Sequence, residues 1–202
     1  MKADREKWNA HYGGRPCAAM SEPNALLVEW LPKLEVSSES PLAVDIACGE
    51  GRHALYLARH GWRVEAMDIS DVALGNLAAL ARAEGLDVAC LVRDFEPEPP
   101  ASPPPFEEGR YDLAVVMRYT NLPLLGQLAR ALRPGGYLIA EAYLKADAPD
   151  GGPRNPAYRV SPGEFEAAVA RDLEIVASRE GMATGRSGLP AAVVQVVARR
   201  PG

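Results

Sequence analysis

The chain has 202 residues and a formal net charge of -5, with 22 Lys and Arg against 27 Asp and Glu. This length suits one domain with a full hydrophobic core. The negative balance argues against a nucleic-acid partner held by a broad basic surface. No apolar run approaches the roughly 20 residues of a membrane span, and the polar N-terminus lacks the apolar centre of a signal peptide. We expect one cytoplasmic domain over residues 1–202, a monomer or weak homodimer without a membrane partner.

Helical and strand patterns alternate along the chain from residue 21 onward. Apolar spacing with Ser start and Gly stop signals predicts helices over residues 21–34, 51–61, 70–85, 121–132 and 161–170. Short apolar or alternating runs predict strands over residues 42–47, 62–68, 86–94 and 111–117, then over 133–144 after a turn, with two more strands near the C-terminus.

This alternation predicts an α/β fold with a Rossmann-like, doubly wound sheet of seven strands. Strands that alternate with helices form a parallel sheet covered on both faces. The last two strands have no helical pattern between them, so they are expected to form an antiparallel hairpin at the sheet edge.

Two segments fit neither pattern. Residues 96–109 contain six prolines and are expected to be a polyproline-like surface connector. Residues 145–161 form a long loop after the fifth strand, and loops of this length are usually functional or mobile.

The turn Ala47-Cys48-Gly49-Glu50-Gly51 follows the first strand. Ligands of open parallel sheets bind beyond the carboxyl ends of the strands, and glycine lets backbone approach a ligand closely. Asp68 ends the second strand, where a carboxylate can accept hydrogen bonds from both hydroxyls of a ribose. Together these features predict a nucleoside-containing cofactor that lies across the first two strands.

Two cofactor classes fit this arrangement. A dinucleotide site usually carries G-x-G-x-x-G and holds a pyrophosphate at a helix N-terminus. Here Asp45 precedes the turn, and a carboxylate is poorly placed beside a pyrophosphate. It suits a cationic amino group instead, which favours S-adenosylmethionine over NAD.

The stretch "VDIACGEGRHALYLARHGWRVEAMDIS" resembles the first motif of class I S-adenosylmethionine-dependent methyltransferases, and "LRPGG" resembles the turn before their fifth strand. More narrowly, "ACGEGRHALYLARHGW" with "PRNPAYRVSPGEF" is similar to small methyltransferases of the tellurite-resistance type. The resemblance covers about residues 21–200 and implies the strand order 3-2-1-4-5-7-6. One departure is Ala47, where the family often has glycine.

The resemblance also implies roles for single residues, with S-adenosyl-L-homocysteine as the product. It places the methionine part of the cofactor on Asp45 and on the backbone of Ala47, Cys48, Gly49 and Gly51. It implies that Asp68 binds the ribose and that Ile69 packs on the adenine. Asp94 would bind the adenine amine, with the Phe95 N–H beside it. Arg52 would pair with the methionine carboxylate. A turn aspartate and a solvated arginine are the alternatives for Asp94 and Arg52.

The acceptor side is expected at the end of the fourth strand and beneath the N-terminal segment. Methyl transfer mainly needs alignment of the two reactants and exclusion of water. We predict Arg118, Tyr119 and Tyr12 as catalytic candidates, with Arg154, Asn155 and Tyr158 as possible additions from the loop 145–161. A general base is needed only if the acceptor loses a proton. No Cys/His spacing suggests a metal site.

Residues 1–20 and 145–161 are predicted to form two lid segments over this site. The expected activity is methylation of a small molecule such as a chalcogen oxyanion, a thiol or a small acid, without a nucleic-acid partner. A non-catalytic S-adenosylmethionine sensor or partner subunit remains the alternative from another class.

Overall fold

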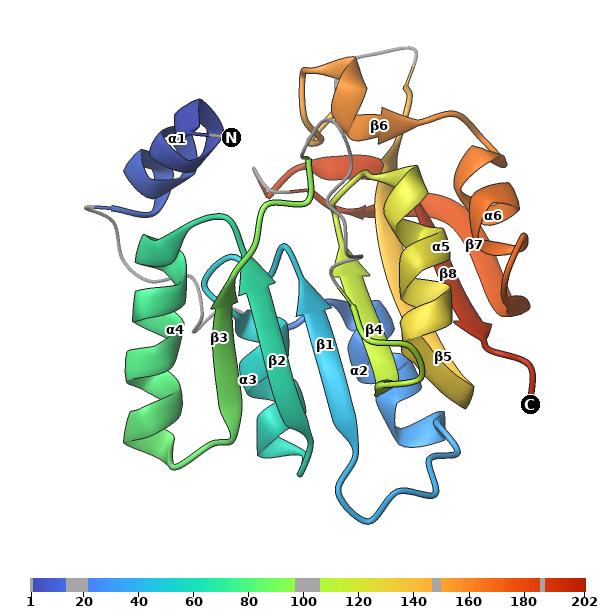
Figure 1. The fold of residues 1–202 in the computed structure, drawn as a ribbon. Coiled ribbons are helices and arrows are strands. Elements are labelled where there is room, and N and C mark those ends of the chain that lie inside the picture. Colours follow the sequence, from blue (N-terminus) through green and yellow to red (C-terminus); the bar gives the residue numbers. More distant parts are fainter. Residues whose placement is uncertain (1, 14–21, 97–105, 147–149, 186–187) are drawn as a thin grey trace.

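The structure is a computed structural model that describes residues 2–13, 22–96, 106–146, 150–185 and 188–202. One sheet runs through the molecule, with strand order β3-β2-β1-β4-β5-β8-β7 and the short β6 paired to β5 (Figure 1). The strands are β1 (Leu42–Ile46), β2 (Arg63–Asp68), β3 (Val88–Val92), β4 (Tyr111–Met117), β5 (Leu132–Leu144), β6 (Arg159–Val160), β7 (Glu174–Thr184) and β8 (Pro190–Arg199).

The predicted sheet is confirmed. Strands β1 to β5 pair in parallel, and β8 is antiparallel to both β5 and β7. The terminal hairpin leaves β7 at the edge and inserts β8 beside β5, which is the order expected for the sixth and seventh strands. Strand β6 was not predicted, because two residues carry no periodic pattern.

The helices are α1 (Lys2–Tyr12), α2 (Ala25–Trp30), α3 (Arg52–Arg59), α4 (Asp71–Glu84), α5 (Leu122–Ala131) and α6 (Glu164–Val169), with 3-10 turns η2 (Leu31–Lys33) and η3 (Pro156–Tyr158). The signals read at both ends of α4 act as predicted, since Ser70 caps its first turn and Gly85 adopts a left-handed conformation after its last. Helix α2 is shorter than predicted because Pro32 ends it in a 3-10 turn.

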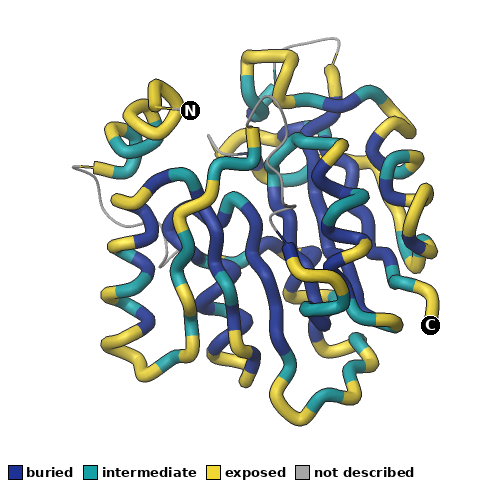
Figure 2. Tube along the Cα trace, in the orientation of Figure 1, coloured by how far each residue is buried: buried dark blue, intermediate teal, exposed yellow. Residues whose placement is uncertain are grey.

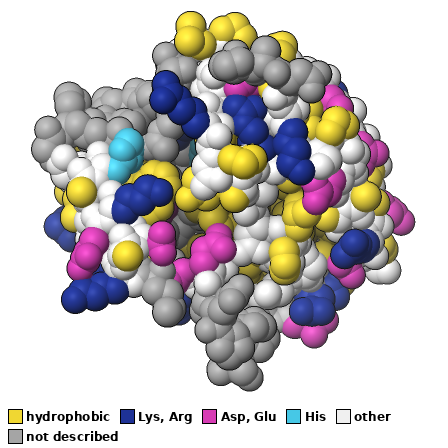
Figure 3. Space-filling model, turned by 90° about the horizontal axis from the view of Figure 1, so that it is seen from above, with side chains coloured by type: hydrophobic (Ala, Val, Ile, Leu, Met, Phe, Trp, Pro, Cys, Tyr) yellow, Lys and Arg dark blue, Asp and Glu magenta, His cyan; other side chains and the backbone are white. Residues whose placement is uncertain are grey.

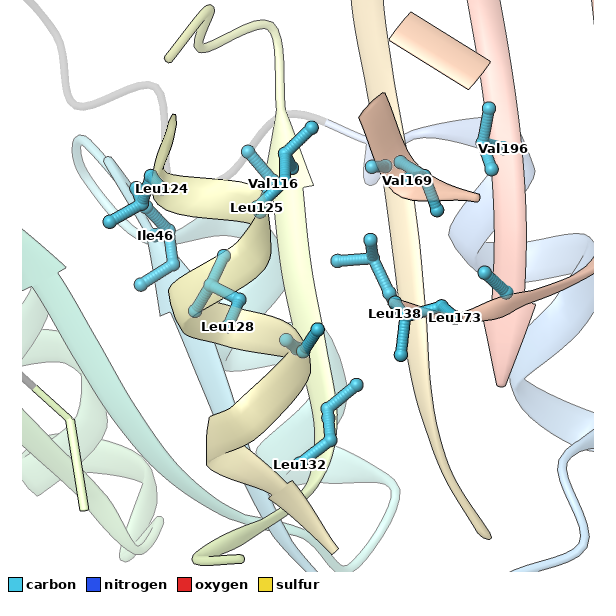
Figure 4. Close-up of a cluster of buried hydrophobic side chains, with 14 of the residues drawn as sticks. Ile46, Val116, Leu124, Leu125, Leu128, Leu132, Leu138, Val169, Leu173 and Val196 are labelled. Atoms are coloured by element: carbon cyan, nitrogen blue, oxygen red, sulfur yellow. The ribbon is translucent and has the colours of Figure 1, made fainter. Parts of the chain in front are cut away.

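The sheet separates two apolar layers, and its central strands are largely buried (Figure 2). Helices α2, α3 and α4 cover one face and α5 and α6 cover the other. Figure 4 shows the second layer, in which Leu124, Leu125 and Leu128 of α5 pack toward Ile46, Val116 and Leu138 of the strands. A core of this kind fixes the carboxyl ends of β1, β2 and β4 rigidly, and the candidate site is built on these ends.

The loop 145–161 contains η3 and β6, and its residues 147–149 lie outside the described residues. The Arg159 guanidinium pairs with Asp150 at 2.5 Å and donates to the carbonyl oxygens of Pro153 and Leu144. Asp150 also accepts from the Ala192 amide, so the loop is tied to β8. The predicted connector 96–109 lies mostly outside the described residues, which resume at Phe106.

Candidate functional site

The turn after β1 has the backbone that the glycine pattern predicts. Gly49 and Gly51 have φ angles of 56° and 78°, and Ala47 joins them in the left-handed region at 51°. Such a conformation costs a non-glycine residue of the order of 1 kcal/mol. A Cβ on Gly51 would overlap the Leu77 side chain of α4. The Cys48 thiol is buried, which raises its pKa, and its amide donates to the Met67 carbonyl.

Asp68 braces this turn from the end of β2. Its carboxylate accepts from the amides of Gly49 and Ser70, each at 2.8 Å. The side chain is 6% exposed, and burial raises its pKa while the backbone amides oppose that rise. A carboxylate has about four lone-pair positions, so acceptor capacity remains beside the turn for ligand hydroxyls.

Asp45 lies on β1 beneath the same turn and is only 1% exposed. Neither of its carboxylate oxygens has a hydrogen-bond partner of standard geometry. Burial and the nearby Asp68 raise the pKa of Asp45 to about 8, against the opposing influence of the Ala54 amide and Arg52. A buried carboxylate without a partner is costly, and an ammonium group on a ligand would relieve that cost.

We expect Asp45→Asn to change how stability depends on pH. The pKa of Asp45 in the folded protein lies above the usual 3.8. Its ionisation therefore lowers the stability of the wild-type protein as pH rises from about 4 towards 8. The quantity compared is the melting temperature of the variant minus that of wild type, both without cofactor. This difference should be at least about 4 °C larger at pH 8.5 than at pH 5. Scanning calorimetry at both pH values measures this, with the exposed Asp87→Asn as control. A difference independent of pH would contradict it.

The residues expected around the adenine gather beyond β2 and β3. Ile69 is half-buried directly after Asp68. Asp94 accepts from the Glu96 amide at 3.0 Å, which is the turn role named as its alternative. The Phe95 ring stacks with Phe106, with centroids 6.0 Å apart. The adenine roles of these residues remain predictions.

Tyr119 lies on this side of the site as well. Its hydroxyl donates to Glu96 at 2.6 Å, and its ring is 6.2 Å from that of Phe95. Burial and Glu96 raise the pKa of Tyr119 well above its usual value. The geometry therefore suits packing beside the expected adenine better than proton transfer at the acceptor.

Arg118 is held at the end of β4. Its Nε donates to Glu141 at 2.7 Å, and its Nη2 donates to the Thr184 carbonyl at 2.6 Å. Its backbone is left-handed, with φ 62°. Arg52 begins α3, is half-buried and donates to the Glu22 carbonyl at 3.4 Å. Burial and the charge of Arg118 lower the pKa of Arg52, so the two predicted arginines lie near one another.

The N-terminal segment predicted as a lid contains α1, a helix that the sequence pattern did not predict. Asp71 accepts from Arg5 at 2.7 Å and from Asn9 at 2.6 Å, and the Ser70 hydroxyl donates to Asn9 at 2.7 Å. A Cβ on Gly49 would lie 2.7 Å from the Tyr12 hydroxyl oxygen. Helix α1 therefore docks on the start of α4 and brings Tyr12 against the glycine turn. Gly14 and the rest of the segment up to residue 20 lie outside the described residues.

The two segments predicted as lids approach each other at the carboxyl ends of the strands. The Lys7 ammonium of α1 lies 5.8 Å from the centroid of the Tyr158 ring in η3. Figure 3 views this end of the molecule, where a group of Lys and Arg side chains lies near the middle of the face. Of the loop residues proposed for the acceptor, Arg154 and Tyr158 are exposed, and Asn155 caps η3.

We expect Asp71→Ala to loosen the docking of α1 on α4. The substitution removes the carboxylate that accepts from Arg5 and Asn9. Helix α1 has no buried side chain that would compensate for this loss. Amide hydrogen exchange over residues 2–12 should accelerate, and the affinity for S-adenosyl-L-homocysteine should fall by less than about tenfold because the pair is exposed. The matched control is Glu84→Ala, which removes the Arg59 ion pair at the other end of α4. Equal exchange rates in wild type and Asp71→Ala would show that α1 is held by other contacts.

Sequence reasoning missed Glu141 and Tyr143, two buried polar residues on β5. The available signal was a carboxylate inside the apolar run "YLIAEAYL". It also missed Asn9 and Asp71, because a contact between two surface helices leaves no pattern in either.

Within the described ranges, no group of three His, Cys, Asp or Glu residues is placed to hold a metal ion. None of the helices described there is long and apolar enough to cross a membrane.

Comparison with known proteins places this site in a family context. Residues 43–136 match the family model of a methyltransferase domain, a range that contains Asp45, the glycine turn, Asp68 and Asp94. A ribosomal RNA small subunit methyltransferase C from Alcanivorax borkumensis is 29% identical over 126 residues, covering 59% of this chain and 37% of that protein. The chain thus spans little more than a third of the length of this curated relative.

Solved structures share the fold at low sequence identity. TehB from Haemophilus influenzae superposes with a TM-score of 0.71 at 18% identity, covering 90% of this chain and 63% of that one. A geranyl diphosphate C-methyltransferase from Streptomyces coelicolor, solved with S-adenosyl-L-homocysteine, gives 0.64 at 18% identity and covers 97% of each chain. Residues 43–136 therefore resemble a methyltransferase domain, and the chain has the fold that these methyltransferase structures share.

Proposed function

We propose that this chain is an enzyme that transfers the methyl group of S-adenosylmethionine to a small-molecule acceptor. One observation carries the choice of cofactor. The glycine turn is flanked by two buried carboxylates, Asp45 and Asp68, and Asp45 has no hydrogen-bond partner of standard geometry. A cationic ligand end would stabilise the ionised form of Asp45 and pair with it, whereas a pyrophosphate offers this carboxyl no positive partner.

In this proposal Asp45 faces the ammonium of the cofactor and Asp68 accepts from the ribose hydroxyls. The cofactor supplies an electrophilic methyl group on a sulfonium. The chain's own residues align it with the acceptor and exclude water, which suits a lid formed by α1 and η3. Tyr12 lies against the glycine turn, where closing the lid would press it towards the bound cofactor.

A small acceptor is favoured by the charge of the chain, which is -5 overall. The geranyl diphosphate C-methyltransferase acts on a small molecule, as its name states, and the ribosomal RNA relative does not. A cytoplasmic monomer or weak homodimer without a nucleic-acid or membrane partner completes the proposal.

The test is a search for turnover. The protein is incubated with methyl-labelled S-adenosylmethionine and a panel of tellurite, selenite, thiols and small acids, with bulk RNA as a further arm. Labelled product from a small molecule, lost in Asp68→Ala, is the expected result. Methylation of RNA alone would contradict the small-molecule acceptor. Tight cofactor binding without turnover of any panel member would favour a sensor or partner subunit instead.

A further inference from the structure

Beyond the cofactor turn, polar side chains converge where β4 and β5 end, on the face of the sheet that α2 and α3 cover. The Arg118 guanidinium carbon lies 5.3 Å from the centroid of the Tyr143 ring. The same guanidinium is bound to Glu141, which is fully buried and also accepts from Gln195 at 2.6 Å. Glu141 therefore has both oxygens occupied and holds Arg118 in place against Tyr143.

Tyr143 is 5% exposed, and its hydroxyl has no hydrogen-bond partner among the residues that the structure describes. A buried hydroxyl left unpaired is unfavourable by about 1–3 kcal/mol. His53 is also 5% exposed, and its Nε2 likewise has no hydrogen-bond partner among the described residues. Burial lowers the pKa of His53 to about 3, with Arg52 and Arg118 as its charged neighbours, so this imidazole is neutral.

The backbone of Arg118 is strained, because it is left-handed with a φ of 62°. Among the described residues, Ala47 is the other non-glycine residue with a positive φ, and it lies in the cofactor turn. Strain of this kind persists where surrounding contacts fix it, and it concentrates at ligand sites. The strained backbone and the unpaired hydroxyl are independent observations, and both lie at the end of β4 and β5.

The cluster adjoins the expected methionine end of the cofactor. Ile46 of β1, directly before the glycine turn, pairs with Val116 of β4, and Met117 of β4 pairs with Glu141 of β5. A group bound between Arg118 and Tyr143 would therefore lie next to the cofactor, as a methyl acceptor must.

We propose that the Tyr143 hydroxyl and the Arg118 guanidinium form a subsite for an oxyanion group of the methyl acceptor, with a carboxylate as the simplest case. The inference rests on the proposed function and narrows its acceptor to an anionic small molecule. The hydroxyl donates a hydrogen bond, and Arg118 supplies the positive charge. In Arg159, another basic residue at this end, Nε, Nη1 and Nη2 all donate to Asp150 or to loop carbonyl oxygens. The bonds of Arg118 to Glu141 and Thr184 use Nε and Nη2, so Arg118 is the better placed of the two.

The matched control lies on the same strand. Tyr137 of β5 is 6% exposed and has the Arg199 guanidinium carbon 5.4 Å from its ring centroid. It faces the same side of the sheet as Tyr143, six residues towards the amino end of the strand. Tyr143→Phe and Tyr137→Phe therefore each remove one hydroxyl from a buried β5 tyrosine that has an arginine near its ring, one at the proposed subsite and one far from it.

The probe is acetate at constant ionic strength, followed through the arginine Nε signals of 15N-labelled protein, alone and saturated with S-adenosyl-L-homocysteine. We expect saturable shifts of the Arg118 signal in the saturated protein. Acetate affinity should fall by at least about tenfold in Tyr143→Phe and stay unchanged in Tyr137→Phe. S-adenosyl-L-homocysteine affinity, measured separately, should be the same in all three proteins.

Two results would overturn the subsite. The first is an Arg118 signal that ignores acetate, or a loss of equal size in both variants. The second is acetate binding that S-adenosyl-L-homocysteine displaces, which would assign the site to the cofactor's own carboxylate. Failure of the proposed function would look different, because cofactor binding or turnover would be absent. The acetate titration of the free protein would still report on Arg118 and Tyr143.

Discussion

Asp68→Ala is expected to lower the affinity for S-adenosylmethionine by roughly tenfold to several hundredfold. Two ribose hydroxyls would lose a charged acceptor, and each such hydrogen bond contributes about 1.5–3 kcal/mol. The same substitution frees the amides of Gly49 and Ser70, so the glycine turn would also lose its brace. The fold should survive, because Asp68 ends its strand outside both apolar layers.

Calorimetric titration with S-adenosyl-L-homocysteine measures the effect, and circular dichroism checks the fold. Asp68→Asn separates the bracing of the glycine turn from the binding of the ribose, because its amide oxygen can still accept from one backbone N–H. Asp87→Ala, in an exposed loop before β3, controls for the loss of one negative charge. An unchanged dissociation constant in Asp68→Ala would mean that the ribose lies elsewhere.

Glu141→Leu is expected to lower the free energy of unfolding by about 3–5 kcal/mol. The variant would leave the Arg118 guanidinium, whose side chain is 18% exposed, without its carboxylate. It would also leave the Gln195 amide without its acceptor. Breaking one half of a buried ion pair has a larger effect than replacing both halves by apolar groups.

Urea unfolding of four proteins tests this directly. Glu141→Leu should be the least stable, and the double variant with Arg118→Met should recover much of the loss. Glu174→Leu, an exposed carboxylate on the edge strand β7, should lie close to wild type. A double variant no more stable than Glu141→Leu would show that the ion pair is not the source of the effect.

The sheet could be predicted because its signals are local. The alternation of periods separates strands from helices, and Ser70 and Gly85 mark both ends of α4. The absence of a helix between β7 and β8 requires an antiparallel return. The positions of Asp45, the glycine turn and Asp68 follow from the same reasoning, because each is tied to the end of a predicted strand.

Other features depend on contacts between distant segments and could not be read in this way. Helix α1 has no buried residue, so no apolar stripe identifies it, and its place is set by Asp71 and Ser70. Arg118 was expected on the acceptor side of the site. Its ion pair with Glu141 appears only when β4 and β5 are placed side by side, with Met117 opposite Glu141. The unpaired hydroxyl of Tyr143 depends on packing that no sequence pattern records.

The central claim is that the turn between β1 and α3 binds a cofactor with a cationic end. Isothermal titration calorimetry of the wild-type protein with S-adenosylmethionine, S-adenosyl-L-homocysteine and NAD is the most direct measurement of it. We predict that the first two bind and that NAD binds much more weakly, because a pyrophosphate offers the buried Asp45 carboxyl no cationic partner. Tight binding of NAD without any binding of S-adenosylmethionine would contradict the account.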